Sequence, residues 1–291
     1  MILVVGAAGN LGRDVVHELA SRGIPVRAMY REFADKEEAP PPGVTLVEGD
    51  FRKLETLVRA LDGVDAAFLV SKEMPGVIER EGAFIEAARR AGTRRIVKLA
   101  RLFAAPDASS ILHRLQWQIV EELRASGVPH TVVRPQAFMQ NVLLDAPTIQ
   151  ATDVIYSAMG PARLAYMDRR DVAAVVATVL LEDGHTGEDY AVSGPALLDY
   201  AEITAQLAKA IGRPLTCIDV PVEAALQGML GMGLPGWFAE AYTGIIQFAK
   251  EGPPQVLTTK FQDIVGRPPT SFAQFASEQR SAFMPLAAAT S

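Results

Sequence analysis

The chain has 291 residues and a formal net charge of −6 at pH 7, with 49% hydrophobic and 21% charged residues. This length allows one large α/β domain or a core domain with a smaller lobe, and the negative charge argues against binding along the phosphate backbone of nucleic acid. The single cysteine excludes an internal disulfide, and no apolar stretch approaches the roughly 20 residues of a membrane span.

The first predicted element is a buried strand at Ile2–Val5, where apolar and β-branched residues follow one another. Because the strand begins directly after Met1, no room is left for a signal peptide. Together with the use of only one cysteine, this favours a reducing compartment, and we expect a cytoplasmic protein.

Glycines at a regular spacing follow this strand, in the order G-x-x-G-x-x-G, and a helical pattern follows the glycines. In such a turn one glycine bends the chain off the strand, the next lets backbone N–H groups approach a pyrophosphate, and the last lets the helix pack on the sheet. The alternative is a glycine-rich turn that only packs. We predict a dinucleotide site that includes Gly6, Gly9, Asn10, Leu11 and Gly12.

Strand and helix patterns then alternate through the first half of the chain. The further strands are expected at Val26–Tyr30, Thr45–Glu48, Ala66–Val70, Arg95–Leu99 and His130–Arg134. The helices are expected at Leu11–Ser21, Lys53–Leu61, Val77–Ala91 and Ile111–Ser126. Regular alternation with short connections predicts a doubly wound parallel sheet of the Rossmann type, covered on both faces, whose ligands bind beyond the carboxyl ends of the strands.

After Pro135 the alternation loosens. We predict a dinucleotide-binding domain at residues 1–150, with a helix at 168–182 packing back on it, and a smaller C-terminal α/β lobe at 151–291. The elements expected in this second part of the chain are Asp171–Leu181, Tyr190–Val192, Tyr200–Ile211, Leu215–Val220, Pro235–Lys250 and Ser271–Phe283.

Two charged residues end the second strand, about 20 residues past the glycine turn, where a Rossmann protein selects its cofactor. Arg31 offers a planar cation for the extra phosphate of NADP(H), whereas the adjacent Glu32 could accept hydrogen bonds from the ribose of NAD(H). We expect NADP(H) to be preferred over NAD(H). The alternative is a pair of solvated loop charges.

The ends of the third and fourth strands supply further cofactor candidates. Asp50 could accept from the adenine amino group while Phe51 packs nearby, although Asp50 could equally cap the following helix. Ser71 and Lys72 follow the fourth strand, where the chain passes the middle of a bound dinucleotide; an exposed turn is the alternative.

The chain resembles the NmrA-like group of atypical short-chain dehydrogenase/reductases. The resemblance is carried by the glycine turn, by Asp50-Phe51 and by Arg134-Pro135…Phe138-Met-Gln-Asn141, and more loosely by Gly187–Val220. The group includes a redox-sensing transcriptional co-regulator, quinone and triphenylmethane reductases, and biosynthetic reductases. The resemblance implies the fold and dinucleotide binding, with Ala100, Pro135 and Phe138 as further cofactor contacts, but it specifies the reaction poorly.

The chain departs from typical short-chain dehydrogenases at their catalytic motif, Tyr-x-x-x-Lys on the helix after the fifth strand. If Glu121 is aligned with the acidic residue one turn beyond that lysine, the tyrosine position holds His113 and the lysine position holds Trp117. Ala100 stands where the serine of the strand end would be. The usual machinery for reducing a carbonyl group is therefore absent.

His113 is then the imidazole expected nearest to the nicotinamide, where it could act as a general acid near neutral pH; a structural histidine is the alternative. The residues predicted to line the substrate pocket are His113, Trp117, Phe138, Met139, Asn141 and, from a candidate lid, Trp237. No His, Cys or carboxylate cluster has metal-ligand spacing, so we expect no metal.

Hydride delivery to a simple ketone creates an alkoxide that needs an acid beside it, whereas a quinone, iminium ion, triarylmethyl cation or enone gives a neutral or delocalised product. We therefore predict an NADPH-dependent reductase of a flat, apolar, electron-poor small molecule. Two alternatives stay open: an NADP(H)-sensing regulator that binds a protein partner without turnover, and a non-redox isomerase or cyclase on the same fold. Neither a membrane nor direct nucleic-acid binding is expected.

Overall fold

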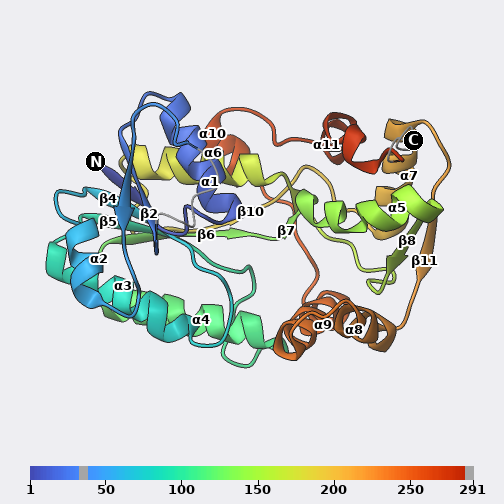
Figure 1. Ribbon diagram of the computed structural model, residues 1–291, viewed down its shortest axis with the longest axis horizontal. Coiled ribbons are helices and arrows are strands. Elements are labelled where there is room, and N and C mark those ends of the chain that lie inside the picture. The colour runs from blue at the N-terminus through green and yellow to red at the C-terminus, as the bar shows by residue number, and fades with distance from the viewer. Residues whose placement is uncertain (33–38, 286–291) are drawn as a thin grey trace, which may run out of the picture.

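The computed structural model describes residues 1–32 and 39–285, and its centre is a seven-stranded parallel sheet (Figure 1). The strand order is β10-β6-β5-β4-β1-β2-β3. Their bounds are β1 Ile2–Val4, β2 Val26–Tyr30, β3 Val44–Glu48, β4 Ala66–Leu69, β5 Arg95–Leu99, β6 His130–Pro135 and β10 Asp189–Val192. Since the order reverses beside β1, the turn that follows β1 lies at the switch point, where doubly wound folds bind their ligands.

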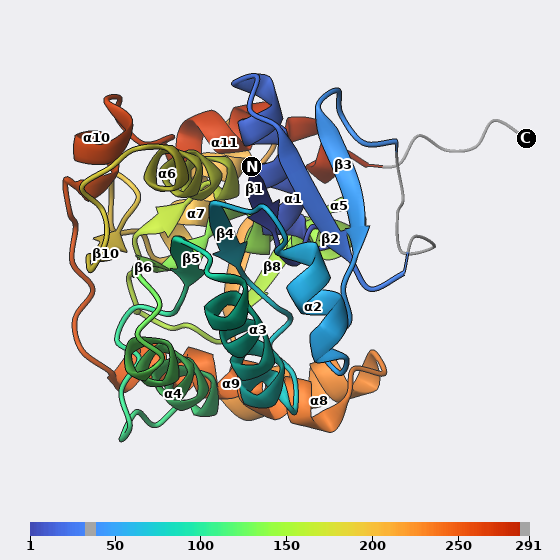
Figure 2. The same cartoon turned by 90° about the vertical axis from the view of Figure 1, so that its left-hand side faces the viewer.

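Helices cover both faces of this sheet (Figure 2). On one face lie α1 (Asn10–Ser21), α6 (Arg169–Leu181) and α10 (Lys260–Val265), and on the other α2 (Leu54–Ala60), α3 (Val77–Ala91) and α4 (Ile111–Ala125). Side chains alternate between the faces of a strand, so Ile2 and Val4 join the core under α1 and α6, whereas Leu3 joins the core under α2 and α3. This two-sided burial explains the unbroken apolar run at the start of the chain.

The remaining elements form a smaller assembly beyond the carboxyl ends of the strands (Figure 1). They are β7 Ala137–Phe138, η2 Met139–Asp145, α5 Ala146–Thr152, β8 Val154–Ser157, β9 Tyr166–Met167, α7 Tyr200–Ile211, β11 Thr216–Asp219, α8 Val222–Gly231, α9 Gly236–Glu251, α11 Phe272–Glu278 and η3 Arg280–Phe283. Two-stranded pairs join β7 with β9 and β8 with β11. A separate apolar core, which includes Met139, Ile149, Leu207 and Phe275, holds most of these elements together. The helices α8 and α9 pack in a second cluster, around Met159 and Ile246.

One strand lies elsewhere than expected. The segment Tyr190–Val192, placed in the smaller lobe by the sequence pattern, belongs to β10 and pairs in parallel with β6, Tyr190 opposite Val133. The chain leaves the main sheet after β6 and returns to it through α6, which a local pattern does not reveal. The division of the chain near residue 150 stays a prediction. No helix in the described part of the chain is long and apolar enough to cross a membrane.

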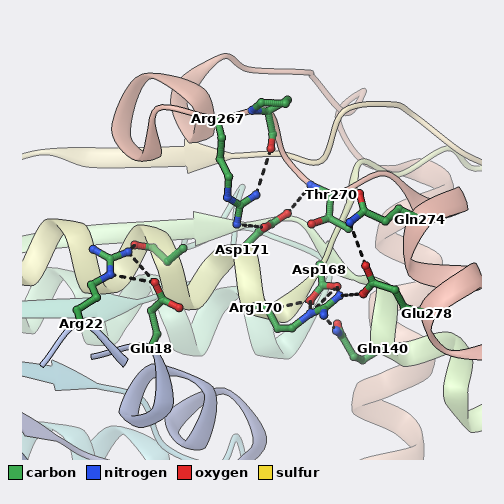
Figure 3. Close-up of polar contacts among 12 residues, drawn as sticks. Glu18, Arg22, Gln140, Asp168, Arg170, Asp171, Arg267, Thr270, Gln274 and Glu278 are labelled. Carbon is green, nitrogen blue, oxygen red and sulfur yellow. Dashed lines mark hydrogen bonds and ion pairs between the residues drawn. The ribbon is translucent and has the colours of Figure 1, made fainter. Parts of the chain in front are cut away.

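Two buried carboxylates at the start of α6 attach the C-terminal segment to the sheet (Figure 3). Asp171 accepts from the Arg267 guanidinium at 2.7 Å and from the Thr270 N–H at 2.6 Å. Asp168, which is fully buried, is paired with Arg170 and accepts from the Gln140 amide at 2.9 Å. Gln140 lies just past β7, so this carboxylate also fixes the segment that leads into the smaller assembly.

Candidate cofactor and substrate site

The turn after β1 leaves backbone N–H groups open to a ligand. Gly6 has φ +71°, and a Cβ on Gly12 would overlap the carbonyl oxygen of Gly6, so the fold itself requires both glycines. A Cβ on Gly9 would meet only that oxygen, at 3.2 Å. Asn10 begins α1 without a side-chain cap, and Leu11 packs into the core, so the first turn of the helix presents its backbone. These features fit a bound pyrophosphate.

Charged residues of both signs follow β2. Arg31 is 60% exposed, with its Nε 3.9 Å from the Glu32 carboxylate. A hollow of ≈ 40 Å³ lies at the end of β2, bordered by Arg13 and His17 of α1 and by Tyr30. Arg13 was missed in the sequence, although it directly follows the last glycine of the turn. The Arg13 guanidinium thus borders the region where the adenosine ribose of a dinucleotide is expected, and Arg31 follows Tyr30 in the chain.

Asp50 forms a local turn after β3. Its carboxylate accepts from the Arg52 backbone N–H at 3.0 Å and pairs with the Arg52 guanidinium at 2.6 Å, which lowers the pKa of Asp50 to about 2. The helix α2 begins at Leu54 with Lys53 in the capping position, so the alternative of Asp50 as helix cap is wrong. Contacts of Asp50 and the half-buried Phe51 with adenine stay a prediction.

A buried polar network lies under the ends of β4 and β5. The Ser71 hydroxyl donates to Glu81 at 2.8 Å, and Glu81 pairs with Lys98 at 2.9 Å; both charged side chains are at most 1% exposed. Lys98 also donates to the Leu99 carbonyl and, at 3.1 Å, to Gln116. Ser71 therefore directs its hydroxyl toward α3. Of the two cofactor candidates after β4, Ser71 is half-buried and Lys72 is exposed.

The network continues to the surface through groups that sequence reasoning missed. Gln116 donates to Glu73 at 3.1 Å, and Glu73 is paired with Arg101 at 2.5 Å. Burial would raise the pKa of Glu73, but Arg101, with smaller effects of Lys98 and Gln116, outweighs it by charge and hydrogen bonding, so that this pKa is lowered. Arg134 donates to the Arg101 carbonyl at 2.8 Å. A lysine between the apolar residues Val97 and Leu99 of β5 was the available signal, because a buried cation needs a partner.

His113 is buried and stacks on Phe248 of α9, with ring centroids 4.0 Å apart. Burial and the nearby Arg101 guanidinium lower the pKa of His113 to about 4, against an opposing effect of Glu73. The ring is therefore neutral at pH 7, and the structure does not support the expectation that it acts as an acid there. The same stacking joins α4 to α9, where a hollow of ≈ 370 Å³ opens beside Phe248 and Phe103.

The other predicted residues lie in three different environments. Ala100 and Pro135 are buried at the ends of β5 and β6. Phe138 and Trp117 are half-buried, as is Trp237, which contacts Phe238 edge-on with centroids 5.8 Å apart. Met139 is 1% exposed and packs in the core of the smaller assembly, and Asn141 is exposed. In the described part of the chain, no group of three His, Cys, Asp or Glu residues is arranged to hold a metal.

The strand order, the glycine turn and its uncapped helix define a dinucleotide-binding protein of the Rossmann type. The sequence model described as the NmrA-like family matches residues 1–253, so the chain belongs to the NmrA-like family, which confirms the resemblance inferred from its motifs.

Relatives of known activity cover nearly the whole chain. An NAD(P)H azoreductase of Xenophilus azovorans is 36% identical over 97% of this chain and 99% of its own. A (4-alkanoyl-5-oxo-2,5-dihydrofuran-3-yl)methyl phosphate reductase of Streptomyces griseus is 38% identical over 98% of this chain and 100% of its own. An NADPH-dependent quinone oxidoreductase of Escherichia coli, solved with NADPH, superposes with a TM-score of 0.87 at 26% identity, over 96% of this chain and 99% of that chain.

Proposed function

We propose that this protein is an NADPH-dependent reductase of flat, electron-poor small molecules such as quinones, iminium ions and enones. The relatives support a nicotinamide-dependent reduction, because those of 36% and 38% identity are both named as reductases. The observation that favours this class of acceptor is the make-up of α4. His113 is buried and neutral there, and Trp117 stands one turn later, so the helix offers no acid for an alkoxide.

Different residues of the chain bind different parts of the cofactor and of the acceptor. The N–H groups from Asn10 onward hold the pyrophosphate, and Arg31 and Arg13 face the extra phosphate of NADP(H). Phe138 and Trp117 present apolar surface to the nicotinamide and to a flat acceptor. The network of Lys98, Glu81 and Gln116 holds the ends of β4 and β5 rigid beneath them. When bound, NADPH supplies the hydride.

The proposal is tested with two panels of acceptors, each followed by the loss of NADPH absorbance. Quinones, enones and iminium compounds should be reduced, while simple aldehydes and ketones should react poorly, because no acid on α4 stabilises the alkoxide. Fast reduction of plain ketones would contradict the proposed acceptor class. Tight NADPH binding with no turnover on either panel would contradict a reductase and favour a cofactor sensor.

Replacing Arg31 by alanine is expected to remove most of the preference for NADPH over NADH. A guanidinium–phosphate contact contributes on the order of 1–3 kcal/mol, so NADPH binding should weaken by roughly ten-fold or more while NADH binding changes little. Fluorescence titrations of both cofactors measure this, with Arg59→Ala on α2 as a control at a position away from the site. Equal affinities of the unmodified protein for the two cofactors would refute the assignment and direct attention to Glu32.

A further inference from the structure

The hollow of ≈ 370 Å³ beside α4 is formed by two segments of the chain that lie far apart in sequence. One segment follows β5 and contributes Phe103, Ala104 and Ala105, and the other ends α9 and contributes Phe248 and Pro253. These side chains are apolar, and two of them are aromatic. An apolar cavity of about 150 Å³ is large enough to hold a benzene ring. The hollow therefore has room for an aromatic ring and its substituents.

Both segments lead directly to the edge of the sheet where the nicotinamide is expected. Phe103 is three residues past Ala100, so their Cα atoms are at most about 11 Å apart. On the other side, Val256 is three residues past Pro253, and its carbonyl accepts from the Gln136 amide at 2.6 Å. Gln136 directly follows β6. The hollow is therefore attached on one side to the end of β5 and on the other to the end of β6.

The segment after β5 is held in a defined shape. The Arg114 guanidinium of α4 donates to the Ala108 carbonyl at 2.5 Å and to the Ser109 carbonyl at 2.8 Å. Phe103 has φ +58°, in the left-handed region that bulky side chains rarely adopt. Strain of this kind is typical of ligand clamps and of other functional sites. The hollow is therefore formed before a ligand enters, which reduces the cost of ordering side chains on binding.

The aromatic ring on the opposite side is fixed as well. Phe248 is 8% exposed, and its ring stacks on His113 with an interplanar angle of 28°. Asp107 and Ser109 also line the hollow and are exposed, so they mark its side open to water. Aromatic rings pair by offset stacking or edge-to-face contact, which strengthens binding beyond the burial of apolar area. Two fixed phenyl rings in one open hollow thus favour a flat aromatic occupant.

We propose that this hollow binds an aromatic arm of the acceptor, separate from the ring that receives the hydride. The inference rests on the proposed function. The reacting ring lies at the ends of β5 and β6, and the arm extends past Ala100 to the space between Phe103 and Phe248. The hollow selects among flat acceptors by the substituent that they carry, whereas the nicotinamide side of the site selects the group that is reduced.

The experiment compares three benzoquinones that carry a methyl, a phenylbutyl or a cyclohexylbutyl group. Each has one alkyl substituent on the reacting ring, so the rings accept hydride equally well. The kcat/KM of the phenylbutyl quinone should exceed that of the methyl quinone by about ten-fold, through KM, because contacts of the arm do not change during hydride transfer. It should exceed that of the cyclohexylbutyl quinone by about two- to ten-fold, the range of an aromatic contact.

Phe103→Asn removes one aromatic wall and keeps a residue that tolerates a positive φ, so the variant should fold. It should reduce the advantage of the phenylbutyl over the methyl quinone by at least about three-fold. Tyr156→Asn is the matched control, because it removes an aromatic side chain of β8 that is 53% exposed and does not line the hollow. This control should keep the advantage.

Three results would overturn the inference. They are equal kcat/KM values of the unmodified protein for the phenylbutyl and methyl quinones, an undiminished advantage in Phe103→Asn, and an equal advantage of the cyclohexylbutyl quinone. The last result would show that the hollow accepts any apolar group and does not recognise an aromatic ring.

A binding measurement without cofactor or turnover separates this inference from the proposed function. Saturation-transfer NMR with phenylbutanol should show contacts of its ring protons with the unmodified protein and with Tyr156→Asn, and weaker ones with Phe103→Asn. Absence of these contacts in a protein that reduces quinones would overturn the inference and leave the reductase intact. Contacts in a protein that reduces none of the three quinones would refute the proposed function, and with it the role of the hollow in holding an acceptor.

Discussion

Gly9→Val is expected to abolish NADPH binding while the protein stays folded. The backbone at Gly9 has φ −82° and ψ 161°, an extended conformation that valine adopts readily. An added Cβ has one neighbour within 4 Å, the Gly6 oxygen at 3.2 Å, which must shift by a few tenths of an ångström; the side chain otherwise enters the space over the first turn of α1. There the branched side chain blocks the approach of the pyrophosphate. We expect affinity to fall more than about 100-fold, or roughly 3 kcal/mol, in fluorescence titrations, with an unchanged circular dichroism spectrum.

Gly12→Ala is the matched control for this prediction. It should destabilise the fold, whereas Gly9→Val should impair cofactor binding by a folded protein. The added Cβ of Gly12→Ala would overlap the backbone of Gly6, so the variant should lose more unfolding free energy than the ~1 kcal/mol typical of point substitutions. If Gly9→Val binds NADPH normally, the cofactor does not bind over the turn after β1, and the assignment of this site fails. If Gly9→Val unfolds, the space seen above Gly9 is not available to a side chain.

Lys98→Met is expected to produce the largest loss of stability. The substitution preserves an unbranched side chain in β5 but leaves the Glu81 carboxylate buried without its cation. Removing one partner of a buried ion pair typically costs 3–5 kcal/mol. Urea unfolding should show this decrease in the free energy of unfolding, while the slope of that free energy against urea concentration stays unchanged. NADPH binding should also weaken, because Ser71 and the ends of β4 and β5 depend on the same network.

Two further variants distinguish the buried pair from an ordinary salt bridge. Lys98→Met combined with Glu81→Leu removes both charges and should recover much of the lost stability. Arg89→Ala removes an exposed ion pair with Glu86; the Arg89 side chain is 56% exposed. This substitution should lower the free energy of unfolding by less than about 1 kcal/mol. If Lys98→Met costs no more than Arg89→Ala, the buried network does not stabilise this fold as its geometry indicates.

Much of the cofactor-binding half was predictable because its signals are local. The helix α1 and the strand β2 begin or end within a residue of the expected positions, since a run of apolar residues on a sheet buried on both faces needs no distant partner to be recognised. The alternation of strands and helices then restricts a parallel sheet to few topologies, because crossover connections are right-handed. The seven-stranded parallel sheet confirms this fold class.

The smaller assembly was poorly predicted because its elements depend on contacts between distant segments rather than on local patterns. Its elements are short, as in β7 and β9 with two residues each, and gain their stability from packing on one another. Met139 illustrates the difficulty: the sequence predicted it to line the substrate pocket, whereas it is 1% exposed and packs in the core of the smaller assembly. That burial is a property of the assembled chain.

The sequence by itself determined the strand-turn-helix unit that begins the chain, the parallel sheet and membership of a dinucleotide-binding family. Those features depend on backbone conformation and on the order of apolar residues, which are encoded within about a dozen neighbouring positions. Only the tertiary structure decided that His113 is neutral and that Lys98 is paired with Glu81. Charge states depend on the solvent excluded and the partners supplied by distant segments, so the chemistry of this site emerges only when the chain is folded.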